Sequence, residues 1–87
     1  MIVYRITHTI ERFLSIGKRE VKRHFSDLNI ANSIYESLSS YLNYGNDEWI
    51  SLEAIDIVNV NGEFIEHSKS TLRYLSDDTK IGVDFRI

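Results

Sequence analysis

The chain contains no cysteine and no proline, and only four of its 87 residues are glycine. Without cysteine there is neither a disulfide framework nor thiolate chemistry, which fits a reducing compartment, so we expect a cytoplasmic protein. Four glycines leave little material for phosphate-cradling loops, and neither a dinucleotide fingerprint nor a Gly-x-Ser-x-Gly turn occurs. These absences favour a protein that is not an enzyme and carries no cofactor.

Long apolar runs are also missing. No stretch approaches the roughly 20 apolar residues that a membrane-spanning helix needs, and charged residues interrupt the N-terminal stretch MIVYRITHTIERF. We therefore expect no membrane partner. The only histidines, His8, His24 and His67, lack the i, i+4 spacing that places two imidazoles on one metal, so no metal site is expected.

The residues that are present are typical of one small folded domain covering residues 1–87. The chain is 43% hydrophobic and 26% charged, which is far from the composition of disordered chains. At this length the protein has a single modest core. Twelve isoleucines against two alanines are typical of an AT-rich genome, such as that of a phage or another mobile element.

The first 25 residues predict a β-hairpin. Apolar residues at every second position predict a strand over 2–10 with one buried face. Gly17 lies at or near the turn, and residues 18–25 alternate again as a returning antiparallel strand. A helix over 10–25 is the alternative, because six apolar or small residues also fall near one helical side: Ile10, Phe13, Leu14, Gly17, Val21 and Phe25.

Residues 28–44 predict a helix about 25 Å long. Ser26 or Asp27 is suited to the N-cap, and Gly45 is placed to end the helix. Apolar residues recur at spacings of three and four, as expected for a helix with one buried side: Leu28, Ala31, Ile34, Tyr35, Leu38, Tyr41 and Leu42.

The second half of the chain predicts further strands. Asn61-Gly62 separates apolar alternations over 49–60 and 63–68, which is a strong hairpin signal because both residues adopt positive φ at little cost. Residues 81–87 alternate as another strand, and residues 71–75 are either its partner or a short helix. We expect a bulge near Ala54, which would leave Asp56 in water instead of burying an unpaired carboxylate.

This order of elements predicts an α+β fold, in which a small antiparallel sheet of four to six strands carries one long helix on one face (β-β-α-β-β-β). A single helix covers only one face of such a sheet. The other face is then open, as antiparallel sheets allow.

Charge is divided unevenly along the chain. Residues 1–25 hold six Lys or Arg against two acidic residues, and residues 26–87 hold four against eleven, so the two parts carry +4 and −7. On a strand, Arg19 and Arg23 point to one side and Lys18, Lys22 and His24 to the other. The candidate basic interaction patch is Arg5, Arg12, Lys18, Arg19, Lys22, Arg23 and His24.

The helix exterior is a second candidate patch, because it is polar but almost uncharged: Asn32, Ser33, Ser37 and Ser40. Either a partner or solvent covers it. We expect a small non-catalytic protein-binding module, an inhibitor or regulator, that acts through its open sheet face, a strand edge or the helix exterior. Nucleic-acid binding by the basic 18–24 region is the alternative, and self-association through opposite charges is a subsidiary one.

Overall fold

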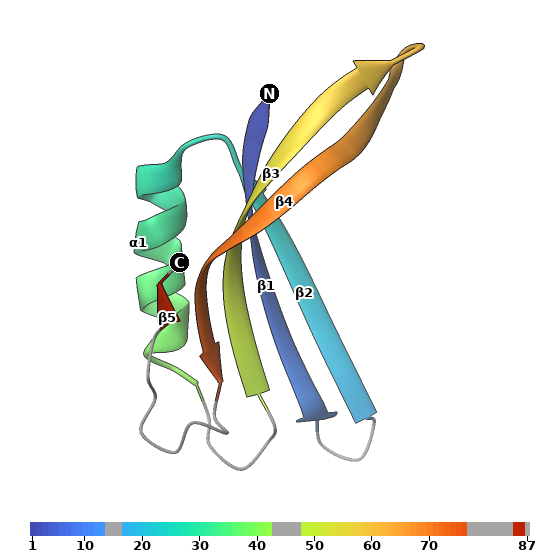
Figure 1. The fold of residues 1–87 in the computed structure, drawn as a ribbon. Coiled ribbons are helices and arrows are strands. Elements are labelled where there is room, and N and C mark those ends of the chain that lie inside the picture. Colours follow the sequence, from blue (N-terminus) through green and yellow to red (C-terminus); the bar gives the residue numbers. More distant parts are fainter. Residues whose placement is uncertain (14–16, 43–47, 77–84, 87) are drawn as a thin grey trace.

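The computed structural model describes residues 1–13, 17–42, 48–76 and 85–86. The strands form one antiparallel sheet in the order β2-β1-β3-β4-β5, with a single helix, α1, packed on it (Figure 1). The predicted α+β class and element order are confirmed. The elements are β1 (Ile2–Phe13), β2 (Gly17–Phe25), α1 (Leu28–Ser39), β3 (Glu48–Val60), β4 (Glu63–Ser76) and β5 (Phe85–Arg86).

β1 and β2 form the predicted hairpin, so the alternative helix over 10–25 is wrong for the residues described. β1 extends three residues past the predicted end, to Phe13. In the register, Ile6 lies opposite Arg23 on β2 and opposite Leu52 on β3. β1 is therefore a central strand, and β2 is an edge strand.

The N-terminus of α1 begins as predicted, with Asp27 and not Ser26 as the N-cap. The Asp27 backbone is extended, and its Oδ1 accepts hydrogen bonds from the amides of Asn29 at 2.8 Å and Ile30 at 3.3 Å. These two amides have no partner inside the helix, so the carboxylate satisfies them.

The helix ends at Ser39 and is about 18 Å long, so the prediction that it continues toward residue 44 is wrong. Ser40 Oγ donates to the carbonyl oxygen of Ser37 at 2.7 Å, the oxygen that the amide of Tyr41 would use in a continuing helix. The Tyr41 amide instead donates to the carbonyl of Leu38 at 3.1 Å. Serine hydroxyls compete with the backbone in this way. The predicted stop at Gly45 lies outside the described residues.

β3 and β4 meet at the predicted turn, where Asn61 and Gly62 have φ of 54° and 87°. The Gly62 amide donates to Asn59 Oδ1 at 3.0 Å, which holds the turn. β4 continues to Ser76, so residues 71–75 are strand, and Arg73 pairs with Arg86 of β5. Of the last strand predicted over 81–87, only residues 85 and 86 lie in the described part of the chain, and they form β5.

The irregularities of the sheet lie on β4. Leu72 and His67 are extra residues there, without a partner on β3. β3 pairs with β1 without interruption from Glu48 to Asp56, so the predicted bulge near Ala54 is wrong in its position. A bulge in β3 would disturb the ladders on both of its sides, whereas β4 meets a second strand only at the short β5. The Asp56 carboxylate is partly exposed, 3.6 Å from the N-terminal amino group.

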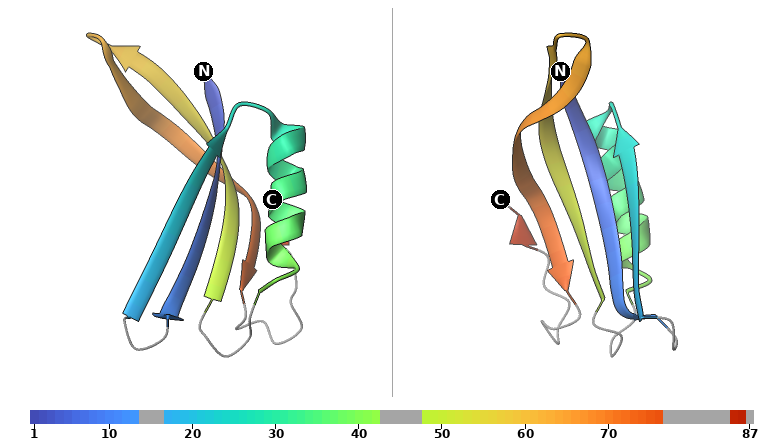
Figure 2. Two further views of the ribbon diagram at one scale, coloured as in Figure 1. Left: turned by 180° about the vertical axis from the view of Figure 1, so that it is seen from behind. Right: turned by 90° about the vertical axis from the view of Figure 1, so that its right-hand side faces the viewer.

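The core lies between the sheet and α1. From the helix, Ala31 and Tyr35 are fully buried, and they meet Ile6, Ile50 and Leu52 of the two central strands. α1 is on one side of the sheet, which we call the helix side (Figure 2). The opposite face is the open side. No helix in the described part of the chain is both long and apolar enough to cross a membrane.

The far end of the β3–β4 hairpin projects from the sheet. Met1 and Ile57 exchange two backbone hydrogen bonds, of 2.8 and 3.1 Å, and β1 begins there. Beyond this point, residues 58–65 form a two-stranded arm that pairs with none of the other described strands. In Figure 1 the arm extends past the other elements. The whole molecule, with the arm, measures 44 Å in its longest dimension.

Candidate functional site

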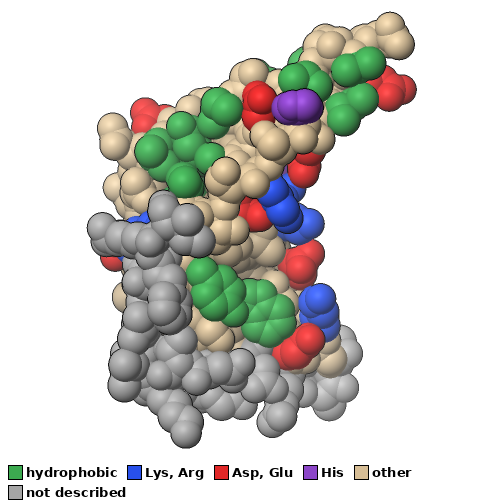
Figure 3. All heavy atoms as spheres, viewed as in Figure 1, with side chains coloured by type: hydrophobic (Ala, Val, Ile, Leu, Met, Phe, Trp, Pro, Cys, Tyr) green, Lys and Arg blue, Asp and Glu red, His purple; other side chains and the backbone are tan. Residues whose placement is uncertain are grey.

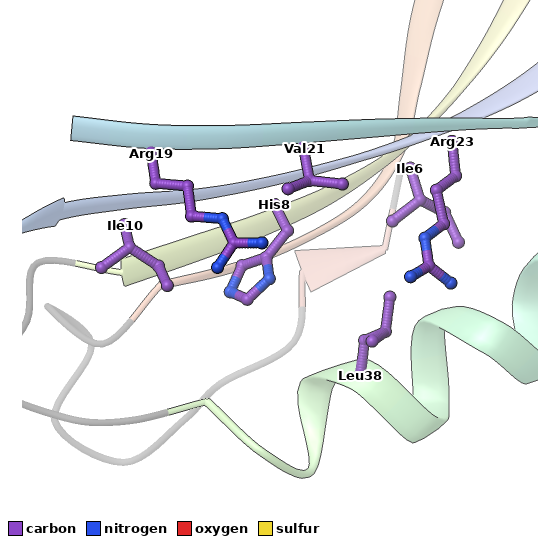
Figure 4. Close-up of a pocket in the computed structure, with 7 residues that line it drawn as sticks. All are labelled: Ile6, His8, Ile10, Arg19, Val21, Arg23 and Leu38. Atoms are coloured by element: carbon purple, nitrogen blue, oxygen red, sulfur yellow. The ribbon is translucent and has the colours of Figure 1, made fainter. Parts of the chain in front are cut away.

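The predicted basic patch is divided between the two sides of the sheet. Arg19 and Arg23 extend from β2 toward α1 (Figure 4). Alternation along β2 places Lys18, Lys22 and His24 on the open side. All five side chains are exposed. Because they face opposite directions, one flat polyanion on either side would meet only part of the patch.

Arg5 is not available to a ligand, because it is built into a network of charges on the open side. Its Nε donates to Glu53 Oε1 at 3.2 Å and its Nη1 to Glu66 Oε1 at 2.7 Å. Lys69 Nζ lies 3.3 Å from Glu53 Oε2. Burial lowers the pKa of Arg5, but the hydrogen bonds to Glu53 and Glu66 and their charges raise it above its ordinary value.

The other members of the patch also differ from one another. Lys22 Nζ lies 3.6 Å from Glu20 Oε1 in an exposed ion pair. His24 lies opposite Arg5 in the register of β1 and β2. The Arg12 side chain lies outside the described residues. The structure thus brings together Arg19 and Arg23 on the helix side and leaves Arg5 apart from them.

A cavity of about 190 Å³ lies between β1, β2 and α1. We call it the β2–α1 cavity. Arg19 and Arg23 line it from β2 (Figure 4), and His8 and Leu38 face it from β1 and α1. The complete lining is Ile6, His8, Ile10, Arg19, Val21, Arg23 and Leu38.

The histidine of this cavity is held by a carboxylate. His8 Nε2 and Glu48 Oε1 are 2.6 Å apart, and Glu48 is almost fully buried. Alternation places Glu48 and Ile10 opposite each other on the helix side of β3 and β1. The sequence gives no sign of this pair, because the two residues are forty positions apart and only the register of β1 on β3 joins them.

Apolar side chains are exposed on the arm. Phe64 is 71% exposed, and Val60 and Ile65 are 44% and 43% exposed. In the register, Ile65 shares one side of the arm with Val58, and Phe64 shares the other with Asn59. Figure 3, in the orientation of Figure 1, shows apolar side chains gathered at the projecting end at the upper right. The sequence predicts the alternation over 49–60. It does not predict that the end of this strand projects beyond the sheet.

The predicted helix-exterior patch is accessible. Ser33, Ser37 and Ser40 are exposed and Asn32 is half-buried. The Ser40 hydroxyl is bound to the Ser37 carbonyl and closes the helix. Glu36, on the same helix, pairs with Arg73 at 2.7 Å. The patch therefore takes part in ending α1, while Glu36, outside the patch, attaches the helix to β4.

Two aromatic residues, Trp49 and Tyr74, lie on the open side. Trp49 is opposite Thr9 of β1, and Tyr74 is opposite Ser51 of β3. Both are half-buried. Trp49 alternates with Ile50, which is in the core, so the period of two was the signal that places it on the open side.

No family model, curated protein or solved structure matches the chain. Within the described residues, no group of three or more histidine, aspartate or glutamate side chains is arranged to hold a metal ion. The geometry of the arm and of the β2–α1 cavity is therefore the basis for the functional proposals.

Proposed function

We propose that the protein is a small non-catalytic protein-binding module whose arm, residues 58–65, inserts into an apolar patch on another protein. The exposure of Phe64, Val60 and Ile65 on an element outside the core is the observation that carries this proposal. Residues 58–65 add little to the core, because the core cluster contains none of them. Their apolar side chains are best explained by burial against a partner.

The energetics support binding by the arm. An isolated two-stranded hairpin is marginally stable in water, so a partner that covers it also orders it. Complete burial of a Phe or Ile side chain contributes roughly 1.5–3 kcal/mol. Phe64 and Ile65 on opposite sides of the arm allow a partner to contact both faces of the hairpin. Aromatic side chains in such positions commonly dominate binding free energy.

Charge defines the chemistry of the partner. The arm, residues 58–65, contains one charged side chain, Glu63; Asp56 and Glu66 flank it, and Asp56 lies 3.6 Å from the N-terminal amino group. Glu66 is shared with Arg5, and Glu63 lies next to the turn. The proposed partner therefore presents an apolar patch bordered by Lys or Arg side chains, which would also steer the encounter. A second copy of the chain, through its basic β2, is the competing occupant.

In this proposal the protein is an inhibitor or regulator that acts in the cytoplasm, encoded by a phage or another mobile element. The absence of cysteine and the isoleucine-rich composition support these finer points. Glu48 and Glu53 are buried and paired, so neither contributes to an exposed acidic surface.

The test is affinity capture from lysate of the source organism after nuclease treatment, with the unchanged protein, the double variant Phe64→Ser/Ile65→Ser and the control Tyr41→Ser. Tyr41 is 79% exposed and lies in the turn that follows α1, outside the arm. We expect one protein to be recovered with the unchanged chain and with the control, and lost with the double variant.

Two results would contradict the proposal. Equal recovery with all three chains would show that the arm does not bind, and recovery that disappears with nuclease would favour the nucleic-acid alternative. If the chain itself is the only protein recovered, and its recovery depends on Phe64 in the same way, the partner of the arm is a second copy of the chain. The oligomeric state measured by analytical ultracentrifugation separates that outcome.

A further inference from the structure

We infer that the β2–α1 cavity binds a small organic acid, with a carboxylate on Arg23 and a hydrocarbon body against the aliphatic wall. The inference concerns a different part of the molecule from the arm and does not depend on the proposed function. It rests on the volume of the cavity, the side chains that line it, and the direction of its two guanidinium groups.

The cavity exists because α1 is short and lies over the central strands. Tyr35 and Ala31 fill the space above β1 and β3, where the core is complete. Toward β2 the helix contributes Leu38, which is half-buried. Val21 of β2 is half-buried in the same way. An edge strand that the helix only partly covers therefore leaves a space on the helix side.

One wall of the cavity is aliphatic. Ile6 is buried beneath it, and Ile10, Val21 and Leu38 are half-buried around it. Water against such a wall gains few hydrogen bonds, so a hydrocarbon group is favoured there. Polar groups that orient a ligand within an otherwise apolar cavity are the usual composition of small-molecule sites.

The other wall is cationic. Arg19 and Arg23 are four residues apart on one strand, so they share a side, and their guanidinium groups enter the space between the sheet and α1 (Figure 4). The side chain of Arg23 makes no hydrogen bond or ion pair with any other described residue, whereas Arg19 has an interaction of its own. The lining of the cavity contains no carboxylate. Arg23 therefore brings to the cavity a positive charge that no described carboxylate pairs with.

Size and geometry together select the ligand class. A cavity of about 150 Å³ accommodates benzene, so about 190 Å³ accommodates an acid of the size of benzoate or hexanoate. A guanidinium group matches a carboxylate through two parallel N–H···O bonds. Inorganic phosphate would also meet the arginines, but it has no group to place against Ile10, Val21 and Leu38. An apolar carboxylate satisfies both walls.

The experiment is a titration of the ¹⁵N-labelled full chain with benzoate and hexanoate, followed by amide chemical shifts. We expect saturable shifts at Val21, Arg23 and Leu38, with no saturation by the neutral isostere benzamide or by inorganic phosphate. Arg23→Gln keeps a hydrogen-bonding side chain without the charge and is expected to weaken benzoate binding at least tenfold, as loss of a charge-assisted bond does.

The matched control is Lys18→Gln, which removes the same charge from the same strand on the open side. It is expected to bind benzoate as the unchanged chain does. Equal weakening by both variants would show a general charge effect, and equal binding of benzamide would show an apolar cavity without selectivity for a carboxylate. Each of these two results would overturn the inference. Saturable binding of phosphate at these residues, or the absence of saturable shifts with both acids, would overturn it as well. Unchanged dispersion of the spectrum shows that each variant is folded.

Discussion

Arg5 Nη1 donates to Glu66 Oε1 at 2.7 Å although β1 and β4 are not neighbours, because the side chains meet above β3. Glu53, on β3, accepts a second bond from the same guanidinium at 3.2 Å. This network joins three strands on the open side at the point where the sheet narrows toward the arm. It connects the stability of the sheet with the position of the arm.

Replacement of Arg5 tests this network. Arg5→Ala leaves the buried Glu53 carboxylate with only Lys69 near it, and we expect the free energy of unfolding to fall by about 2–3 kcal/mol. Urea denaturation followed by Trp49 fluorescence measures the change. Lys22→Ala removes an exposed ion pair and is the control, with an expected change below about 0.5 kcal/mol. Equal effects of the two variants would show that the network contributes little to stability.

The N-cap of α1 gives a second prediction, in which two adjacent residues are compared. Asp27→Ala leaves the amides of Asn29 and Ile30 without their acceptor, so we expect a loss of about 1 kcal/mol in unfolding free energy. Ser26→Ala removes a hydroxyl that was an equally good candidate in the sequence and should change stability little. Thermal denaturation followed by circular dichroism measures both. A larger loss of unfolding free energy for Ser26→Ala than for Asp27→Ala would show that Ser26, and not Asp27, is the N-cap.

Local signals in the sequence were sufficient where the chemistry is local. Asn61-Gly62 predicts its turn because both residues tolerate positive φ, and Asp27 predicts the start of α1 because its carboxylate reaches two nearby amides. The end of α1 was not predicted, because the apolar spacing continues past Ser39 while the Ser40 hydroxyl takes the carbonyl that the helix would need.

The candidate sites depend on relationships that are not local. Arg19 and Arg23 were predicted to share a side, but the space in front of them exists only because α1 lies over β1 and β3. Arg5 was assigned to the basic patch because of its charge, and the register of the strands places it against Glu53 and Glu66 instead. The arm follows from the register of β1 on β3, in which Ile2 lies opposite Asp56 and β3 continues to Val60; alternation within each strand does not determine that register.

Charge reversal on β2 separates protein binding from nucleic-acid binding. Lys22→Glu/Arg23→Glu changes the charge of the edge strand by four, and a nucleic-acid complex would lose both its affinity and the salt dependence of that affinity. The proposed function predicts that capture of a foreign partner through the arm is nearly unchanged. Electrophoretic mobility with random-sequence DNA and RNA at two salt concentrations, together with the capture assay, measures both. Loss of capture would place the binding surface on β2.

The central claim is that the apolar side chains of the arm bind a partner, and calorimetric titration of the captured partner tests it most directly. Phe64→Ser/Ile65→Ser is expected to raise the dissociation constant about thirtyfold or more, because loss of a central aromatic contact costs about 2 kcal/mol or more of binding free energy. Tyr41→Ser should bind as the unchanged chain does. An affinity for the double variant within about threefold of the unchanged chain, with the fold intact by circular dichroism, would contradict the account.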